Sequence, residues 1–228
     1  MDLSPFALFE PFRDRLAVAI WNKHDPQPHD ICGVLDVKEE ASAEQVHGAK
    51  TAIVRSAMSH VPGADGLITD QSGLALSVRW ADCQTFVVYA PERNVVGVLH
   101  AGWRGLNAGA IPAFFAALKR EWDIEPQDTY VVAGPSLCAK CAQFSDPARE
   151  LTTIDPMFFH ERHVDLRGTA DAQFFALGLP HDHLERSPEC TSCTSGTYWT
   201  FRGGDREAVK RGGTNVLGCV LLDRNERK

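Results

Sequence analysis

Apolar runs rich in β-branched and aromatic residues recur along the chain, each bounded by turn-forming residues. Runs of this composition without regular polar positions are typical of strands that are buried on both faces. We therefore expect strands at residues 16–21, 74–80, 85–90, 95–99, 129–134 and 215–222. A shorter strand-like run covers residues 51–55.

Helical patterns stand between these runs. Apolar residues recur every three or four positions from Ile111 to Trp122. Asp146-Pro147 has the form of an N-cap followed by a first-turn proline, and a further helix is expected over residues 165–177 with Gly178 as its C-terminal stop. Strands and helices are therefore expected to be interleaved.

Composition bounds the class of protein. The chain has 228 residues, of which 44% are hydrophobic and 23% charged, which excludes a disordered or fibrous protein. It has no internal repeat and no low-complexity linker, so we expect a single domain over residues 1–228, in which residues 1–45 carry few functional signals. The N-terminus lacks the pattern of a secretory signal, and no stretch approaches the roughly 20 apolar residues of a membrane span. We expect a cytoplasmic protein without a membrane partner.

Charge and cysteine content narrow the chemistry. The net charge is −7, from 23 Lys plus Arg against 30 Asp plus Glu, and the basic residues are scattered, which argues against polymeric nucleic acid as a partner. Seven cysteines are an odd number and too few for a disulfide scaffold. They are better interpreted as core residues, nucleophiles or metal ligands.

Candidate site residues lie at the ends of buried strands. In sheets whose faces are covered by helices, ligands usually bind outside the strand ends. Cys83 follows one strand, His100 ends another, and Ser136 lies in the Gly-Pro-Ser turn after a third. Two imidazoles and a thiolate, from His47, Cys83 and His100, are a suitable three-ligand set for Zn²⁺ with a fourth position open to water. The sequence leaves open that Cys83 is a small buried hydrophobe and that the histidines are structural.

Polar neighbours of these residues are candidate substrate contacts. His100 opens the segment His-Ala-Gly-Trp-Arg-Gly before the helix of Phe114, where small residues and Arg104 favour an anion such as phosphate. The alternative is a tight turn with Arg104 paired to a surface carboxylate. Asp82 would orient a histidine or a water, or form a turn. Arg202 is expected at the end of a short aromatic strand, where it would reach a ligand phosphate or mark a sheet edge.

Other histidines and cysteines leave alternatives open. Two C-x-x-C pairs are separated by more than the interval of a zinc ribbon: Cys138 with Cys141, and Cys190 with Cys193. A structural tetrathiolate zinc site is one interpretation, but the spacing favours thiols that line a cavity or pack in the core. A thioredoxin-like motif is not expected, because neither pair opens a helix after a strand. His181-Asp-His183 is interpreted as solvated loop histidines in preference to a surface metal site.

Several blocks in order resemble the laccase-domain family, once labelled polyphenol oxidases and now regarded as purine nucleoside phosphorylases with adenosine deaminase activity. The resemblance covers about residues 45–222. The blocks are Gln45-Val46-His47-Gly48, Ala64-Asp65-Gly66-Leu67-Ile68-Thr69, Ala81-Asp82-Cys83, Leu99-His100-Ala101-Gly102-Trp103-Arg104-Gly105-Leu106, Gly134-Pro135-Ser136 and Cys190-Thr191.

The resemblance implies an α+β fold, a single-domain α/β/β/α sandwich of mixed sheets with helices on the outer faces. It implies His47, Cys83 and His100 as zinc ligands and catalytic centre, with inorganic phosphate and a small-molecule nucleoside as substrates. We expect the substrate to contact the residues Asp82, Arg104, Ser136 and Arg202.

The chain departs from the family pattern on the substrate side. Residues 1–45 lack the Arg-Gly-Gly turn that usually contributes an arginine, and Ala170 stands where the family has an asparagine. The Gly-Pro-Cys-Cys-Tyr-Glu stretch is represented by residues 138–143, without its acidic residue, and the Ser-Tyr-Arg-Arg strand by residues 200–203. Substrate identity is therefore less well defined by the sequence than the metal centre.

Three other functions stay open. A copper-dependent polyphenol oxidase needs many paired histidines, whereas this chain has nine histidines and one His-x-His motif. A metal-independent hydrolase would use Cys83 as nucleophile with His100 or His47 as its base. A catalytically impaired relative would bind a nucleoside without turning it over.

Overall fold

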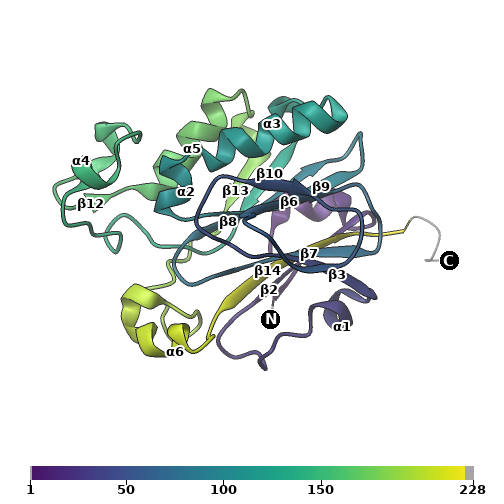
Figure 1. The fold of residues 1–228 in the computed structure, drawn as a ribbon, viewed down its shortest axis with the longest axis horizontal. Helices are drawn as coiled ribbons and strands as arrows, with labels where there is room; N and C mark the ends of the chain where they lie inside the picture. Colours follow the sequence, from purple (N-terminus) through teal and green to yellow (C-terminus); the bar gives the residue numbers. More distant parts are fainter. Residues whose placement is uncertain (1, 224–228) are drawn as a thin grey trace.

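The computed structural model describes residues 2–223 as two six-stranded sheets that lie face to face, with helices outside them (Figure 1). The first sheet has the order β1 (Asp2–Leu3), β2 (Leu16–Trp21), β14 (Asn215–Leu221), β7 (Leu74–Trp80), β3 (Glu39–Ala43) and β5 (Met58–Val61). The second has the order β13 (Leu184–Arg186), β10 (Tyr130–Ala133), β8 (Gln84–Ala90), β9 (Val95–Ala101), β6 (Gly66–Thr69) and β4 (Thr51–Ile53).

Both sheets are mixed. In the first sheet β3 runs parallel to β5 and β7, while β14 is antiparallel to β2 and β7. In the second, β8 is antiparallel to β9 and β10, and the parallel pairs are β4 with β6 and β10 with β13.

Helices cover the outer face of each sheet. Figure 1 shows α2 (Trp103–Asn107), α3 (Ala110–Trp122) and α5 (Leu166–Ala176) over the second sheet, and α1 (Ile31–Leu35) beneath the first. The expected α/β/β/α sandwich of mixed sheets is confirmed. The smaller elements are 3₁₀ turns at Ala7–Phe12, Pro126–Asp128, Pro156–Phe158 and His181–His183, a two-stranded sheet of β11 (Phe159–His160) and β12 (His163–Val164), α4 (Pro147–Glu150), a π-helical turn at Phe201–Asp205, and α6 (Arg206–Lys210).

The unbroken apolar runs have a simple cause in this layering. Successive side chains of a strand point to opposite faces, and both faces here are covered. In β8, Phe86 and Val88 pack in the cluster under the helices, whereas Val87 and Tyr89 pack between the sheets. The strands expected from the apolar runs are confirmed, with β2 and β7 at the expected limits.

Local signals begin and end the helices as expected. The Asp165 side chain accepts a hydrogen bond from the backbone N–H of Gly168 at the start of α5, and Gly178 follows α5 with φ of 100°. Asp146 caps α4 in the same way. A short helix, α2, intervenes between His100 and the helix of Phe114, because Gly109 adopts a left-handed conformation with φ of 79° between α2 and α3.

The expected aromatic strand before Arg202 is wrong. Residues 198–200 form no strand, and Arg202 lies in the π-helical turn Phe201–Asp205. The Thr200 side chain accepts a hydrogen bond from the backbone N–H of Gly203, which stabilises a turn in place of an extended chain.

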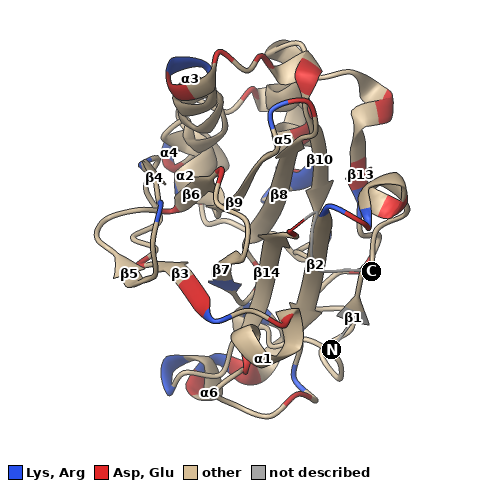
Figure 2. Cartoon of the chain, turned by 90° about the vertical axis from the view of Figure 1, so that its right-hand side faces the viewer, with Lys and Arg blue, Asp and Glu red and all other residues tan. Residues whose placement is uncertain are grey.

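Charged residues lie mainly on helices and loops, with both signs interspersed and the central strands largely free of them (Figure 2). Within residues 2–223, no helix combines the length and the apolar character needed to cross a membrane.

Candidate metal centre

His47, Cys83 and His100 meet where the chain passes between the two sheets. His47 lies in the connection from β3 to β4, Cys83 in the turn from β7 to β8, and His100 within β9. Both connections join a strand of the first sheet to a strand of the second. One ligand atom of each side chain lies within 4.8 Å of the others, so the structure brings together three residues that are distant in sequence.

Asp65, at the start of β6, holds two of the three side chains in place. Its carboxylate is fully buried and lies 2.9 Å from Nδ1 of His100. The same carboxylate accepts the backbone N–H groups of Val46, His47 and Gly48 at 2.7 to 3.1 Å. These bonds stabilise His47 in a left-handed conformation, with φ of 60°, which ordinary side chains rarely adopt.

Without a metal, Cys83 and His100 form a charged pair. Burial opposes ionisation of the thiol, but the charge and hydrogen bonds of His100 and His47 outweigh it and lower the pKa of Cys83 to about 6. Burial likewise opposes the imidazolium, but the Cys83 thiolate and the Asp65 carboxylate raise the pKa of His100 to about 9. The site therefore favours a thiolate, which is the form that binds a metal or acts as a nucleophile.

One side of the group faces a cavity of about 580 Å³. His100 is 2% exposed and Cys83 partly exposed, while His47 is exposed on the cavity side. A cavity of this size suits a small organic ligand. Gly102 also lines it, and a Cβ at that position would lie 2.6 Å from Sγ of Cys83, so only glycine fits there without displacing the thiol.

Two of the expected substrate contacts are arginines that line this cavity. Arg104 is exposed, and its guanidinium lies over the ring of Trp103, 4.1 Å from the centroid. Within residues 2–223 no carboxylate pairs with Arg104, which leaves its charge available to an anion. Arg202 lines the cavity too, donates to the backbone carbonyl of Gln143 and lies over Phe144.

Asp82 lines the cavity as well, whereas Ser136 does not. The buried Asp82 carboxylate accepts hydrogen bonds from the Thr191 and Thr200 hydroxyls, at 2.8 and 2.6 Å, and from the Arg202 backbone N–H. Asp82 therefore holds in place the cavity wall that carries Arg202. Ser136 is fully buried and its hydroxyl accepts a hydrogen bond from Nε of Arg167. The structure thus brings Asp82, Arg104 and Arg202 to the cavity, but not Ser136.

The remaining candidates are the cysteines of the two C-x-x-C pairs and the histidines of the His-x-His motif. All four cysteines of the C-x-x-C pairs come together outside the cavity. Cys190 belongs to the core under the helices, Cys138 and Cys141 pack against that core, and Cys193 is exposed, so core packing describes three of the four thiols. Nδ1–H of His183 donates to the carbonyl of Thr129 and the ring stacks on Tyr130, whereas His181 is exposed against Phe175. In residues 2–223 neither histidine joins a group able to hold a metal.

Sequence reasoning missed two functional residues of this site. Asp65 belongs to one of the sequence blocks that resemble the family, but the sequence gives it no role. Its role follows from hydrogen bonds to residues that are distant in the chain. Arg79 lines the cavity from β7, where it is exposed in an otherwise buried strand. A single charge within an apolar run was the signal that could have identified Arg79.

The chain is similar to known proteins in sequence and in fold. A family model described as multi-copper polyphenol oxidoreductase laccase matches residues 28–217. Purine nucleoside phosphorylase YlmD of Geobacillus stearothermophilus is 31% identical over an alignment of 180 residues, and the match covers 70% of this chain and 65% of that protein. Adenosine deaminase RL5, from an unknown prokaryotic organism, is 23% identical over 74% of this chain and 71% of its own. The crystal structure of the Geobacillus YlmD superposes with a TM-score of 0.79 at 24% identity, over 94% of each chain.

Proposed function

The chain belongs to the multi-copper polyphenol oxidoreductase laccase family, and from this premise we propose that it is a zinc enzyme acting on purine nucleosides. The proposed reactions are phosphorolysis of adenosine, inosine or guanosine and deamination of adenosine. The names of two relatives, a purine nucleoside phosphorylase and an adenosine deaminase, support this substrate class. The observation that carries the proposal is the convergence of His47, Cys83 and His100 on one side of the cavity.

The donor set fits zinc better than copper. Two imidazoles and one thiolate, open on one side, are the ligands of a catalytic zinc site, in which a fourth position stays free. A blue-copper site with the same donors adds a weak axial ligand, which is a methionine, a glutamine or a backbone oxygen. Neither Met58 nor Met157 lines the cavity, but Gln45 and Gln84 do, so the preference for zinc rests on the open tetrahedral donor set and on the second group of ligands. The chain's second metal-competent group within residues 2–223 contains cysteines alone, so no histidine-rich copper cluster accompanies this centre.

Zinc bound by these three side chains would lower the pKa of a coordinated water to about 7, which supplies the nucleophile that deamination of adenosine requires. The chain itself prepares this site. The Asp65 carboxylate accepts a hydrogen bond from Nδ1–H of His100, so that Nε2 is the nitrogen left to bind the metal. The His47 loop is fixed by the same carboxylate, and Cys83 is present as a thiolate at neutral pH.

Phosphorolysis also requires an anion site in the cavity. A phosphate oxygen must be held near the anomeric carbon of the sugar while positive charge develops there and the bond to the base breaks. Arg104 and Arg202 both line the cavity, and guanidinium groups bind phosphate through paired hydrogen bonds. We assign Arg104 to the phosphate because its guanidinium has no hydrogen-bond partner in the described chain, whereas that of Arg202 donates to the carbonyl of Gln143. We assign Asp82 to the positioning of the wall.

A metal-independent cysteine hydrolase is the second candidate. The lowered pKa of Cys83 and its contact with His100 favour it, because a thiolate beside an imidazole is an activated nucleophile. A chelator separates the two candidates: the zinc enzyme loses turnover on removal of its metal, whereas the hydrolase keeps it.

The test is a product assay on the purified chain with adenosine, inosine and guanosine, each with and without inorganic phosphate. We expect free base and sugar phosphate only when phosphate is present, and inosine from adenosine in its absence. A Cys83→Ala variant should lose both activities and the zinc of this centre. Full turnover by that variant, or turnover that survives complete chelation, would refute the zinc centre as the catalytic site.

A further inference from the structure

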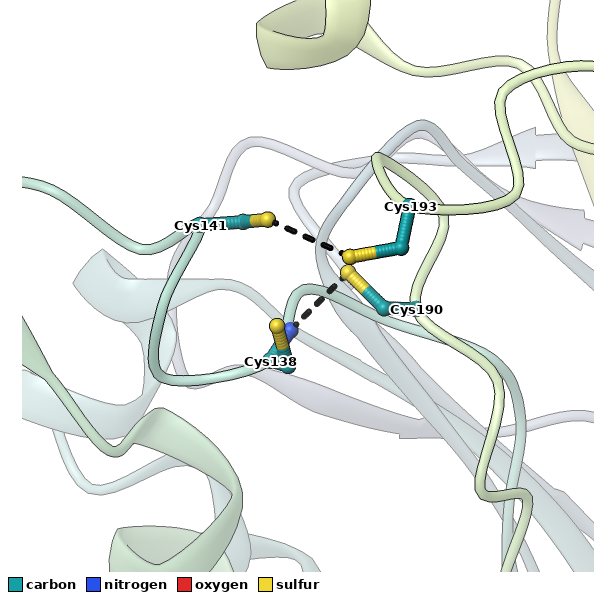
Figure 3. A group of neighbouring side chains, drawn as sticks. All are labelled: Cys138, Cys141, Cys190 and Cys193. Atoms are coloured by element: carbon teal, nitrogen blue, oxygen red, sulfur yellow. Dashed lines mark hydrogen bonds between the residues drawn. The ribbon is translucent and has the colours of Figure 1, made fainter.

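Four cysteine thiols converge from two loops that are far apart in sequence. Cys138 and Cys141 follow β10, Cys190 and Cys193 follow β13, and all four Sγ atoms lie within 4.8 Å of one another. Figure 3 shows the sulfurs of both loops pointing into the same space. None of the four lines the cavity of the His47 centre.

The spacing of the sulfurs suits a single metal ion. Zinc–sulfur bonds of about 2.3 Å in a tetrahedron separate the sulfurs by about 3.8 Å. Sγ of Cys141 lies 3.6 Å from Sγ of Cys193, close to that value. A donor set of four thiolates, with no imidazole and no open side, is typical of structural zinc sites.

The backbone of both loops already has the turn that such a site needs. The N–H groups of Cys141 and Ala142 donate to the carbonyl of Cys138 at 3.0 and 3.1 Å, and the N–H of Thr194 donates to the carbonyl of Cys190 at 2.9 Å. Each turn places two cysteines of a pair on one side. The N–H of Cys138 also donates to Sγ of Cys190 at 3.2 Å, an interaction that stabilises negative charge on sulfur.

A partly buried cation accompanies the cluster. Arg167, on α5, donates to the carbonyls of Leu137, at 3.1 Å, and Pro188, at 3.2 Å, and so binds both cysteine loops. Its guanidinium also donates to the carbonyl of Glu189, directly before Cys190. Four thiolates around one divalent ion carry excess negative charge, which Arg167 offsets.

We propose that Cys138, Cys141, Cys190 and Cys193 bind one zinc ion in a closed tetrathiolate site that joins these two loops. On binding, each thiol releases its proton and the zinc keeps its oxidation state, so that no oxidant or reductant is needed. This site is separate from the proposed catalytic centre and has a structural role.

The two loops also build part of the catalytic wall. Leu137, next to Cys138, donates its N–H to the carbonyl of Asp82 at 3.1 Å, and the hydroxyl of Thr191, next to Cys190, donates to the Asp82 carboxylate. Asp82 directly precedes Cys83. A zinc ion that restrains the two loops therefore restrains the wall through Asp82.

The test counts zinc in purified full-length protein by mass spectrometry of the metal. Unmodified protein should hold about two zinc ions per chain, and Cys83→Ser and the double variant Cys141→Ser/Cys193→Ser about one each. Cys32→Ser is the control, because Cys32 is partly exposed on α1 and belongs to neither group, and it should hold as much zinc as the unmodified protein. Zinc in the Cys83→Ser protein reports on the tetrathiolate site whether or not the enzyme processes nucleosides.

X-ray absorption at the zinc edge keeps the proposal testable if the double variant does not fold. In the Cys83→Ser protein it should show four sulfur neighbours at about 2.3 Å. Nitrogen or oxygen neighbours, iron in place of zinc, no metal in that protein, or a disulfide between Cys141 and Cys193 in unreduced peptides would each overturn the proposal.

Discussion

Oδ1 of Asp65 lies 2.9 Å from Nδ1 of His100, and both side chains are almost completely shielded from solvent. Burial disfavours the charged carboxylate, but the hydrogen bonds from His100 and from the Gly48 and His47 amides outweigh it and lower the pKa of Asp65. A carboxylate that stays ionised can only accept, so Nδ1 of His100 must donate. Asp65 thus determines which nitrogen of His100 remains for a metal.

Replacing Asp65 by Asn should weaken zinc binding at the His47 centre about 10- to 100-fold, because the neutral amide no longer fixes the His100 tautomer. Competition with a fluorescent chelator measures the affinity. Asp70→Asn is the control, since Asp70 also accepts hydrogen bonds, from Arg55 and Trp122, but none from the three proposed zinc ligands. Unchanged affinity in Asp65→Asn would contradict the positioning role.

A methyl group at position 102 should disrupt the centre sterically. The Cβ of Gly102→Ala would lie 2.6 Å from Sγ of Cys83 and 3.4 Å from Cδ2 of His47, so the thiol must move. We expect at least about a tenfold loss of both zinc affinity and turnover, since small displacements of ligands are costly. Gly196→Ala, where the added Cβ meets nothing within 4 Å, should behave like the unmodified protein. Equal zinc affinity in the two variants would refute the close packing around Cys83.

Removing Arg104 should raise the KM for inorganic phosphate about 10- to 100-fold, because hydrogen bonds to charged groups contribute about 1.5–3 kcal/mol. Adenosine deamination, which uses no phosphate, should keep its rate in Arg104→Ala. Initial rates over a range of phosphate concentrations measure the effect. The matched control is Arg149→Ala on α4, outside the cavity. A phosphate KM unchanged by Arg104→Ala would remove Arg104 from the anion site.

Alkylation of Cys83 in metal-free protein should reveal its lowered pKa. The thiolate fraction, and with it the rate of reaction with iodoacetamide, should rise about tenfold per pH unit below pH 6 and level off above it. Cys32 is the internal control: burial and the charges of Glu40 and Asp30 raise the pKa of its thiol, so its rate should still rise at pH 9. Peptide mass spectrometry follows both sites. A Cys83 rate that rises through pH 9 would disprove the charged pair with His100.

The helical face of the second sheet depends on aromatic packing. Phe174 is fully buried, with its ring 5.0 Å from Phe86 and 6.0 Å from Phe115. Phe174→Ala should lower the free energy of unfolding by about 3–5 kcal/mol, as measured by urea denaturation. The next residue, Phe175, is half-buried and contacts His181, so Phe175→Ala should cost clearly less. Similar costs for the two variants would argue against this packing.

Much of the fold could be predicted from the sequence, because strands that are buried on both faces appear as apolar runs. The limits of β7 could be predicted, since its run is mainly apolar, with Ser77 and Arg79 as the exceptions, and its ends carry turn residues. Arg202 shows the limit of this reasoning, because aromatic residues before it suggested a strand, whereas a local hydrogen bond of Thr200 produces a turn.

The site could be predicted from the sequence only in part. His47, Cys83 and His100 are individually unremarkable in sequence, and their meeting depends on two connections between sheets. The interval between the C-x-x-C pairs likewise hid their convergence, because β10 and β13 are distant in the chain but adjacent in the sheet. Pairing of distant strands, which local patterns do not encode, accounts for both cases.

The position of β14 has a consequence for biosynthesis. This strand lies between β2 and β7, although both of those emerge from the ribosome long before it does. Until residue 221 has been translated, two apolar strand edges lack their common neighbour and offer a template for intermolecular pairing. The first sheet therefore stays divided, with both of these edges exposed, during most of the synthesis of the chain.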